Sequence, residues 1–210
     1  MRKSSPKALD LAQLALFSAI VIVLAFTPFI GYIPLGITKA TIIHIPVIIG
    51  SILLGPKKGA ILGALFGATS LISNTISPTL ASFTFSPFYS GGNFWSLVVC
   101  FVPRILVGVV PYFVYRGIKK LQKSEKASEV LPLAVAGLAG SMTNTLLVMH
   151  LILLFFGDSY AQVKGVAVQA LYGFILTIIG VNGVPEAIVA MLFTVVIVKA
   201  LFRAGYRAKQ

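Results

Sequence analysis

Six apolar stretches, separated by short polar connections, are the dominant pattern of the sequence. Most contain about 20 apolar residues, the length that a helix needs to cross the hydrocarbon core of a bilayer. We therefore predict an all-α integral membrane protein, a bundle of six transmembrane helices that forms a single domain over residues 1–210. The predicted spans are 9–30, 40–55, 59–76, 94–116, 130–156 and 169–201.

The composition also indicates a membrane protein. Hydrophobic residues make up 58% of the chain and charged residues only 10%, with a mean hydropathy of +0.98. Soluble domains carry about 25% charged residues. The net charge of +12 does not indicate a nucleic-acid partner, because the basic residues are not interleaved with aromatic residues that could stack on bases.

The positions of the Lys and Arg residues predict the orientation of the bundle. Fourteen of the seventeen lie at the ends of predicted spans on one side. Short cytoplasmic loops are enriched in these residues, so both termini are predicted to be cytoplasmic. Of the exceptions, we interpret Lys39 and Lys164 as residues at the outer rim, whereas Arg104 lies inside a predicted span.

Two connections on the outer side differ from hydrated linkers. Residues 31–36 and 77–93 contain aromatic, proline and glycine residues and no charged residue. Long loops in compact proteins are often lids or binding loops, and we predict that these two cover a binding site. The alternative is that their aromatic residues only mark the membrane interface, where such residues are enriched.

Polar side chains in four predicted spans are expected to lie at one depth. They are His44, Arg104, Asn144 and Glu186. Measured at 1.5 Å per residue from the inner end of its helix, each lies roughly 18–21 Å into the membrane. Polar residues are costly inside a bilayer and therefore suggest a functional site. Asn182 shares a helix face with Glu186, and together these residues predict a pocket that opens to the outside.

Each of these residues also has a purely structural interpretation. Arg104 and Glu186 could form an ion pair, because intramembrane charges usually pair. Asn144 and Asn182 could hydrogen-bond neighbouring helices, and His44 could be a packed core residue. The common depth of the set favours the pocket.

Small residues recur at helical spacing in two predicted spans. Gly59, Gly63 and Gly67 form a stripe that is suited to close packing against another helix. Ala15 and Ala19 have Ala-x-x-x-Ala spacing near the inner end of the first span. That spacing is common in membrane proteins and is not diagnostic alone.

The sequence contains no recognisable catalytic or cofactor motif. It lacks a Walker A motif, a His-Glu-x-x-His pair and a Gly-x-Ser-x-Gly turn. We therefore expect no enzymatic activity, no metal site and no cofactor, which disfavours a membrane enzyme. An independent secondary transporter is a further alternative, although the inverted repeats that many such transporters contain are not evident.

Several stretches, none specific alone, form a distinctive combination along the whole chain. They are Ala15–Ala19, Ile42–Gly50, Leu54–Gly59, Gly63–Gly67, Phe85–Phe88, Pro103–Arg104, Gly140–Thr145 and Asn182–Glu186. With six predicted spans and both termini inside, the chain resembles the substrate-specificity subunits, or S components, of energy-coupling factor (ECF) vitamin transporters.

The resemblance implies a binding protein in the plasma membrane of a prokaryote, driven by partner subunits. In that family the Ala-x-x-x-Ala pair contacts a membrane scaffold subunit that docks onto two ATPases, which implies this role for Ala15 and Ala19. The vitamin binds from outside, two outer loops close over it, and the subunit reorients in the membrane. Both lid candidates match those loops.

Two segments, Thr143–Thr145 and Asn182–Glu186, look most like the pantothenate branch of the family. Pantothenate carries a carboxylate, hydroxyls and an amide, which suit Arg104 and the neutral polar side chains of the predicted pocket. Hydroxymethylpyrimidine, riboflavin and folate are alternatives, because these could stack on Trp95 or Tyr89. The candidate substrate-binding residues are His44, Tyr89, Asn93, Trp95, Arg104, Asn144, Asn182 and Glu186.

Overall fold

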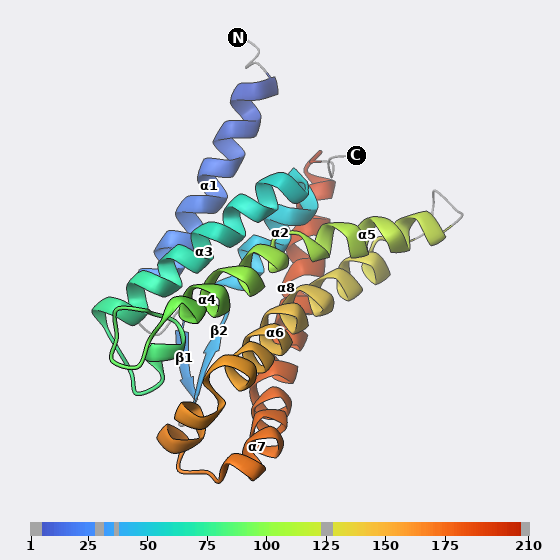
Figure 1. Cartoon of the computed structure of the whole chain (residues 1–210). Helices are drawn as coiled ribbons and strands as arrows, with labels where there is room; N and C mark the ends of the chain where they lie inside the picture. Colours follow the sequence, from blue (N-terminus) through green and yellow to red (C-terminus); the bar gives the residue numbers. More distant parts are fainter. Residues whose placement is uncertain (1–5, 28–31, 36–37, 123–127, 207–210) are drawn as a thin grey trace.

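The computed structural model describes residues 6–27, 32–35, 38–122 and 128–206, and these are nearly all helical (Figure 1). They form the α-helices α1 Pro6–Phe26, α2 His44–Leu54, α3 Pro56–Ile76, α4 Phe94–Val107, α5 Val110–Leu121, α6 Val130–Lys164, α7 Leu171–Ile178 and α8 Val184–Arg203. The short elements are the 3₁₀-helices η1 Ser82–Thr84 and η2 Val168–Ala170 and the π-helix η3 Ile179–Gly183.

A β-hairpin that the all-α prediction omitted connects α1 to α2. Strands β1 (Tyr32–Leu35) and β2 (Thr38–Thr41) are antiparallel, with Tyr32 opposite Thr41. This pairing keeps the backbone extended as far as Thr41, so the prediction of a helix from residue 40 is wrong at that boundary. Strand β1 occupies the middle of the first lid candidate, residues 31–36, and β2 follows it; the ends of the candidate, Gly31 and Gly36, lie outside the described residues.

Five helical segments of the described chain are long and apolar enough to cross a membrane. They are α1, α3, α4 with α5, α6, and α7 with α8. The predicted span 40–55 corresponds instead to α2, which has 11 residues and a length of about 16 Å. All its residues are buried, so α2 lies inside the bundle, surrounded by the longer helices.

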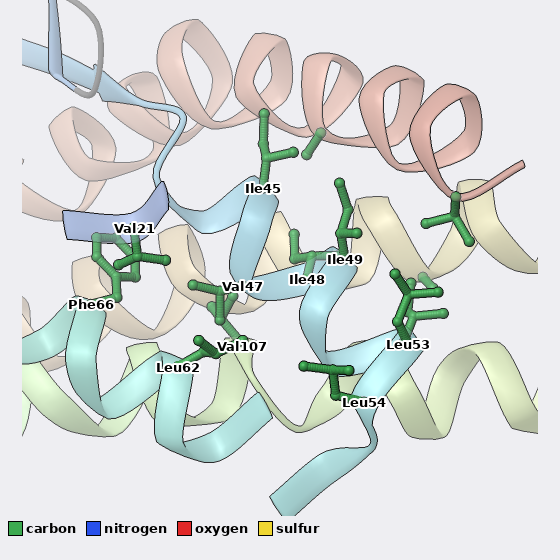
Figure 2. Close-up of a cluster of buried hydrophobic side chains, with 14 of the residues drawn as sticks. Val21, Ile45, Val47, Ile48, Ile49, Leu53, Leu54, Leu62, Phe66 and Val107 are labelled. Atoms are coloured by element: carbon green, nitrogen blue, oxygen red, sulfur yellow. The ribbon is translucent and has the colours of Figure 1, made fainter. Parts of the chain in front are cut away.

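Helix α2 is at the centre of the larger hydrophobic core. Val47, Ile48 and Ile52 are fully buried and pack with Leu62 of α3 and Val107 of α4 (Figure 2). Side chains of α1, α5, α6 and α8 also belong to this cluster. A second buried cluster joins α4, α6 and α7. The two cores hold together the helices that carry the predicted polar residues.

Helix α1 lies at the edge of the bundle (Figure 1). Val21 and Ala25 are buried against the rest of the protein, whereas Leu11 and Val23 remain 67% and 61% exposed. A continuous exposed apolar face of this kind fits contact with lipid or with another membrane protein. The first turns of α1 and the end of α8 lie at the same end of the bundle.

The glycine stripe of α3 brings α3 and α4 into backbone contact. A methyl group added at Gly59 would overlap the backbone of Gly108, and one at Gly63 would overlap the carbonyl oxygen of Arg104. At Gly67 an added Cβ would lie 2.8 Å from the ring of Phe101. The interpretation of this stripe as a close-packing surface is confirmed.

Replacing Gly63 by alanine should therefore destabilise the protein, because the new methyl group must push α4 away from α3. Overpacking of this kind typically costs about 1–3 kcal/mol. Thermal unfolding of the purified protein in detergent would measure the effect. Gly117→Ala is the matched control, since Gly117 is a helical glycine of α5 with open space around it. Equal unfolding temperatures for the two variants would contradict the packing role.

Candidate functional site

A cavity of about 470 Å³ lies between the helices at one end of the bundle. This is the end where Figure 1 shows the hairpin, opposite the first turns of α1, and we call it the hairpin end. The cavity walls come from β2, α3, residues 79–85, α4, α6, α7, η3 and α8. Segments between Thr41 and Glu186 that are far apart in the sequence therefore meet around one cavity.

Half of the predicted substrate-binding residues line this cavity. They are Arg104, Asn144, Asn182 and Glu186, from α4, α6, η3 and α8 respectively. Three of the four residues expected at one depth, Arg104, Asn144 and Glu186, thus line one cavity, together with Asn182. The other four candidates, His44, Tyr89, Asn93 and Trp95, are not among its lining residues.

Arg104 is a buried cation at the cavity wall, with only 7% of its surface exposed. Its Nη1 donates a hydrogen bond of 2.7 Å to the carbonyl of Val99. In a regular helix that carbonyl would accept from residue 103, but Pro103 has no N–H. The side chain of Arg104 replaces the missing donor, and this bond fixes the direction of the guanidinium group.

Two aromatic rings complete the surroundings of Arg104. Its guanidinium carbon lies 5.5 Å from the ring centre of Phe66 and 5.2 Å from that of Phe85. Cation–π contacts of this kind stabilise a cation without neutralising it. The Nε atom is buried and has no hydrogen-bond partner. The group therefore keeps its charge, and its Nε–H has no acceptor.

The ion pair between Arg104 and Glu186, which was the structural alternative, is absent from the part of the chain that the structure describes. The ion pairs there are Lys58–Asp10 at 2.9 Å and Lys119–Glu129 at 2.6 Å. Glu186 instead accepts a hydrogen bond of 2.8 Å at Oε1 from the backbone N–H of Thr41. The carboxylate thus connects the hairpin to α8.

The amide side chains line the cavity from α6 and η3. Oδ1 of Asn144 is buried without a hydrogen-bond partner, although unsatisfied buried acceptors are rare and costly. Asn182 is buried within the π-helix η3. Pro185, in the first turn of α8, cannot donate to the preceding turn, and a π-helical turn at this place is typical of functional sites.

The sequence analysis missed a polar stripe on α3. Ser70, Ser73, Asn74 and Ser77 all line the cavity. Their i, i+3, i+4, i+7 spacing places them on one face of the helix. This spacing was visible in the sequence and could have identified them.

The sequence analysis also misplaced the end of α6. The helix continues to Lys164, eight residues beyond the predicted span, and is kinked at Phe156, where φ is −135° and ψ is 16°. Tyr160 and Lys164 of the segment after the kink line the cavity. Lys164, interpreted as a rim residue, therefore lies at the site itself. Gly157 and Ser159 directly after Phe156 are the sequence feature that could have indicated this kink, because sharp bends in helices often occur at glycine and serine.

The second lid candidate is anchored by hydrogen bonds. Oγ of Ser82 donates to Oδ1 of Asn74 at 2.8 Å, and Oγ of Ser96 donates to the carbonyl of Phe83 at 2.7 Å. Five residues of this loop line the cavity, namely Ser77, Thr79, Leu80, Ala81 and Phe85. The loop is therefore one wall of the site, as expected for a segment that covers it.

The candidates outside the cavity have other contacts. Oδ1 of Asn93 accepts from the backbone N–H of Trp95 at 2.9 Å and caps α4. Trp95 stacks on Phe155 with ring centres 4.0 Å apart and an interplanar angle of 10°. His44 begins α2 and is buried, and Tyr89 is half-buried in the loop. Contact of these residues with a substrate stays a prediction.

The Ala-x-x-x-Ala pair lies far from the cavity in sequence and on a different surface. Ala15 and Ala19 are both exposed on α1. Two small exposed residues one turn apart leave a shallow surface that another helix can approach closely. The structure thus leaves the pair accessible, and its contact with a scaffold subunit stays a prediction.

Comparison with known proteins identifies the class. Residues 9–198 match the family described as "ECF transporter, substrate-specific component". The chain belongs to this family.

Two curated relatives are similar to this chain over nearly its full length. The chain is 41% identical to the "Pantothenic acid transporter PanT" of Lactococcus lactis subsp. cremoris, over 97% of this chain and 98% of that protein. It is 28% identical to the "Pantothenate transporter PanT" of Leuconostoc mesenteroides subsp. mesenteroides, over 98% of each protein. The similarity in both cases extends over nearly the entire chain.

A solved structure supports the fold. The S component for biotin from an ECF-type ABC transporter superimposes with a TM-score of 0.55 at 20% sequence identity, covering 95% of each chain. This comparison concerns the arrangement of the helices alone.

The bond between Thr41 and Glu186 leads to a prediction about the hairpin. Glu186→Ala should accelerate hydrogen exchange of the Thr41 amide by about tenfold or more, because hydrogen bonds to charged groups contribute about 1.5–3 kcal/mol. Glu186→Gln keeps an oxygen acceptor and should preserve most of the protection. Exchange measured by mass spectrometry on peptides covering residues 38–43 would test this. Identical exchange in all three proteins would show that the bond does not hold the hairpin.

Proposed function

We propose that this chain is the high-affinity substrate-binding subunit of an ECF-type importer for pantothenate. The observation that carries the proposal is Arg104, a buried guanidinium that faces the cavity and pairs with no carboxylate among the described residues. A buried charge without a counter-ion is costly. An anionic substrate supplies that counter-ion, and both curated relatives carry pantothenate in their names.

The chemistry of the cavity matches the parts of pantothenate. We assign the carboxylate to Arg104, which has a buried, unpartnered Nε–H donor. Oδ1 of Asn144 is an acceptor for a hydroxyl or amide hydrogen of the substrate. Asn182 and Glu186 add polar groups from η3 and α8. His44, Tyr89, Asn93 and Trp95 belong to the proposal only if the outer segments rearrange when substrate binds.

Aromatic vitamins fit this cavity less well than pantothenate does. Among its lining residues the aromatic side chains are Phe85 and Tyr160, and each carries a cation over its ring, from Arg104 and Lys164 respectively. The one tryptophan of the chain already stacks on Phe155. Little aromatic surface is left for a flat ring system such as that of riboflavin or folate.

In this proposal, partner subunits supply the energy for import. The chain docks through Ala15 and Ala19 on a scaffold subunit that carries two ATPases, and reorients in the plasma membrane of a prokaryotic cell. Both termini are cytoplasmic, with α2 counted as the sixth membrane helix. The hairpin end, with the cavity, then faces outwards. The unequal distribution of Lys and Arg supports this orientation.

Mass spectrometry of small molecules released from the freshly purified chain tests the substrate directly. We expect pantothenate, and calorimetric titration should show saturable binding with one molecule per chain. Release of another vitamin would contradict the assignment. Proteoliposomes that contain the chain alone should not accumulate pantothenate. Concentrative uptake without ATPase partners would instead support the secondary transporter.

The role of Arg104 can be separated from a general effect on folding. Arg104→Gln should weaken pantothenate binding about 10- to 100-fold, as expected for the loss of a charge-assisted hydrogen bond. Pantothenol, in which an alcohol replaces the carboxylate, should bind the variant and the wild-type protein with similar affinity. An equal loss of affinity for both ligands would mean that the substitution damages the site as a whole. An unchanged affinity for pantothenate would make Arg104 a structural residue only.

The docking role of α1 generates a second experiment. The double substitution of Ala15 and Ala19 by tryptophan should abolish co-purification of the scaffold subunit while pantothenate binding persists, because bulky side chains prevent close helix contact. The matched control is the double tryptophan substitution of Leu16 and Ile20, an exposed pair with the same spacing on the adjacent face. If the control disrupts assembly as strongly, the small-residue pair is not the contact.

A further inference from the structure

We propose that Lys164 is a second cation of the substrate cavity, which captures the anionic substrate at the hairpin end before Arg104 binds its carboxylate. The inference rests on the proposed function and adds a specificity-determining residue to it. Among the described residues, three charged side chains line the cavity, namely Arg104, Lys164 and Glu186. With all three ionised the wall carries one net positive charge, which suits a monoanion.

The kink of α6 is what brings Lys164 to the cavity. Asn144 and Lys164 are both lining residues of this helix. A straight helix would separate them by about 30 Å. At Phe156 the backbone leaves the helical conformation, and the last turns of α6 change direction beside the hairpin (Figure 1). Because of this bend, Lys164 lies beside the cavity.

The surroundings of Lys164 keep its ammonium group near the wall. Nζ lies 5.5 Å from the ring centre of Tyr160, one helical turn earlier on α6 and also a lining residue. A cation–π contact holds the long side chain in one region without neutralising its charge. Lys164 is half-buried, in a position between the cavity and the surface.

The two cations differ in a way that divides their roles. Arg104 is buried and its guanidinium is fixed by the carbonyl of Val99, which suits a directed contact in the bound state. Lys164 ends on a compact charge with a flexible stem, which suits a transient contact. A cationic cleft with low-dielectric walls raises the association rate of anions. The geometry therefore assigns different effects to the two cations. Lys164 mainly increases the association rate of the substrate, and Arg104 mainly stabilises the bound substrate.

Association kinetics of the purified, full-length chain test this assignment. Rates would be measured with labelled pantothenate by rapid filtration, at low ionic strength and again at about 1 M salt, where charges are screened within about 3 Å. The variants are Lys164→Gln, which removes the charge, and Lys164→Arg, which keeps it. Lys199→Gln removes the same charge from a half-buried lysine of α8 that does not line the cavity.

We expect Lys164→Gln to slow association about three- to tenfold at low salt. This is part of the increase in association rate that a whole charged cleft provides. High salt should abolish the difference, Lys164→Arg should restore most of the rate, and Lys199→Gln should match the wild-type protein. Binding of the neutral pantothenol should be unaffected by any of these changes.

Two results would overturn the proposal. Equal rates for Lys164→Gln and Lys199→Gln would show that Lys164 contributes no more than any other positive charge. An equal effect on pantothenate and pantothenol would show that Lys164 is needed only for the shape of the cavity. If the wild-type protein binds no pantothenate at all, it is the proposed function that fails. Repeating the rate comparison with whichever small anion co-purifies then decides the role of Lys164.

Discussion

The close contact between α3 and α4 is the constraint on which the rest of the site depends. Gly63 lies against the carbonyl oxygen of Arg104, so no side chain separates the two helices there. Phe66, also on α3, then comes within cation–π distance of the guanidinium group. The same helix presents the polar stripe that begins at Ser70 to the cavity. A packing rule for membrane helices thus determines where the charge of the site lies.

Prolines decide which polar groups face the cavity. Pro103 leaves the carbonyl of Val99 without its helical donor, and the side chain of Arg104 provides one. Pro185 follows a π-helical turn that carries Asn182. Inside a membrane, backbone groups freed by proline must find another partner, because no water is available. Here the compensation also orients a side chain or reshapes a turn at the cavity.

The segments that cover the cavity are held by different means. Residues 77–93 are anchored by neutral hydrogen bonds to α3 and α4, such as that from Ser82 to Asn74. The hairpin is tied to α8 by the carboxylate of Glu186. A residue first considered as the partner of Arg104 therefore connects two segments that are 145 residues apart in sequence. This arrangement leaves Arg104 free to bind an anion, which the proposed function requires.

The sequence by itself determined the membrane class, the family, the positions of the long helices and four residues of the cavity wall. These follow from apolar length, from the depth of polar residues and from motifs, all of which are local along one helix. Tertiary structure decided the rest. The span predicted at 40–55 became a short, buried helix after a hairpin, Lys164 moved to the cavity through a kink at Phe156, and Glu186 bonded to Thr41 rather than to Arg104. Bends and hydrogen bonds between distant segments depend on how helices pack, and no periodicity within a single helix encodes them.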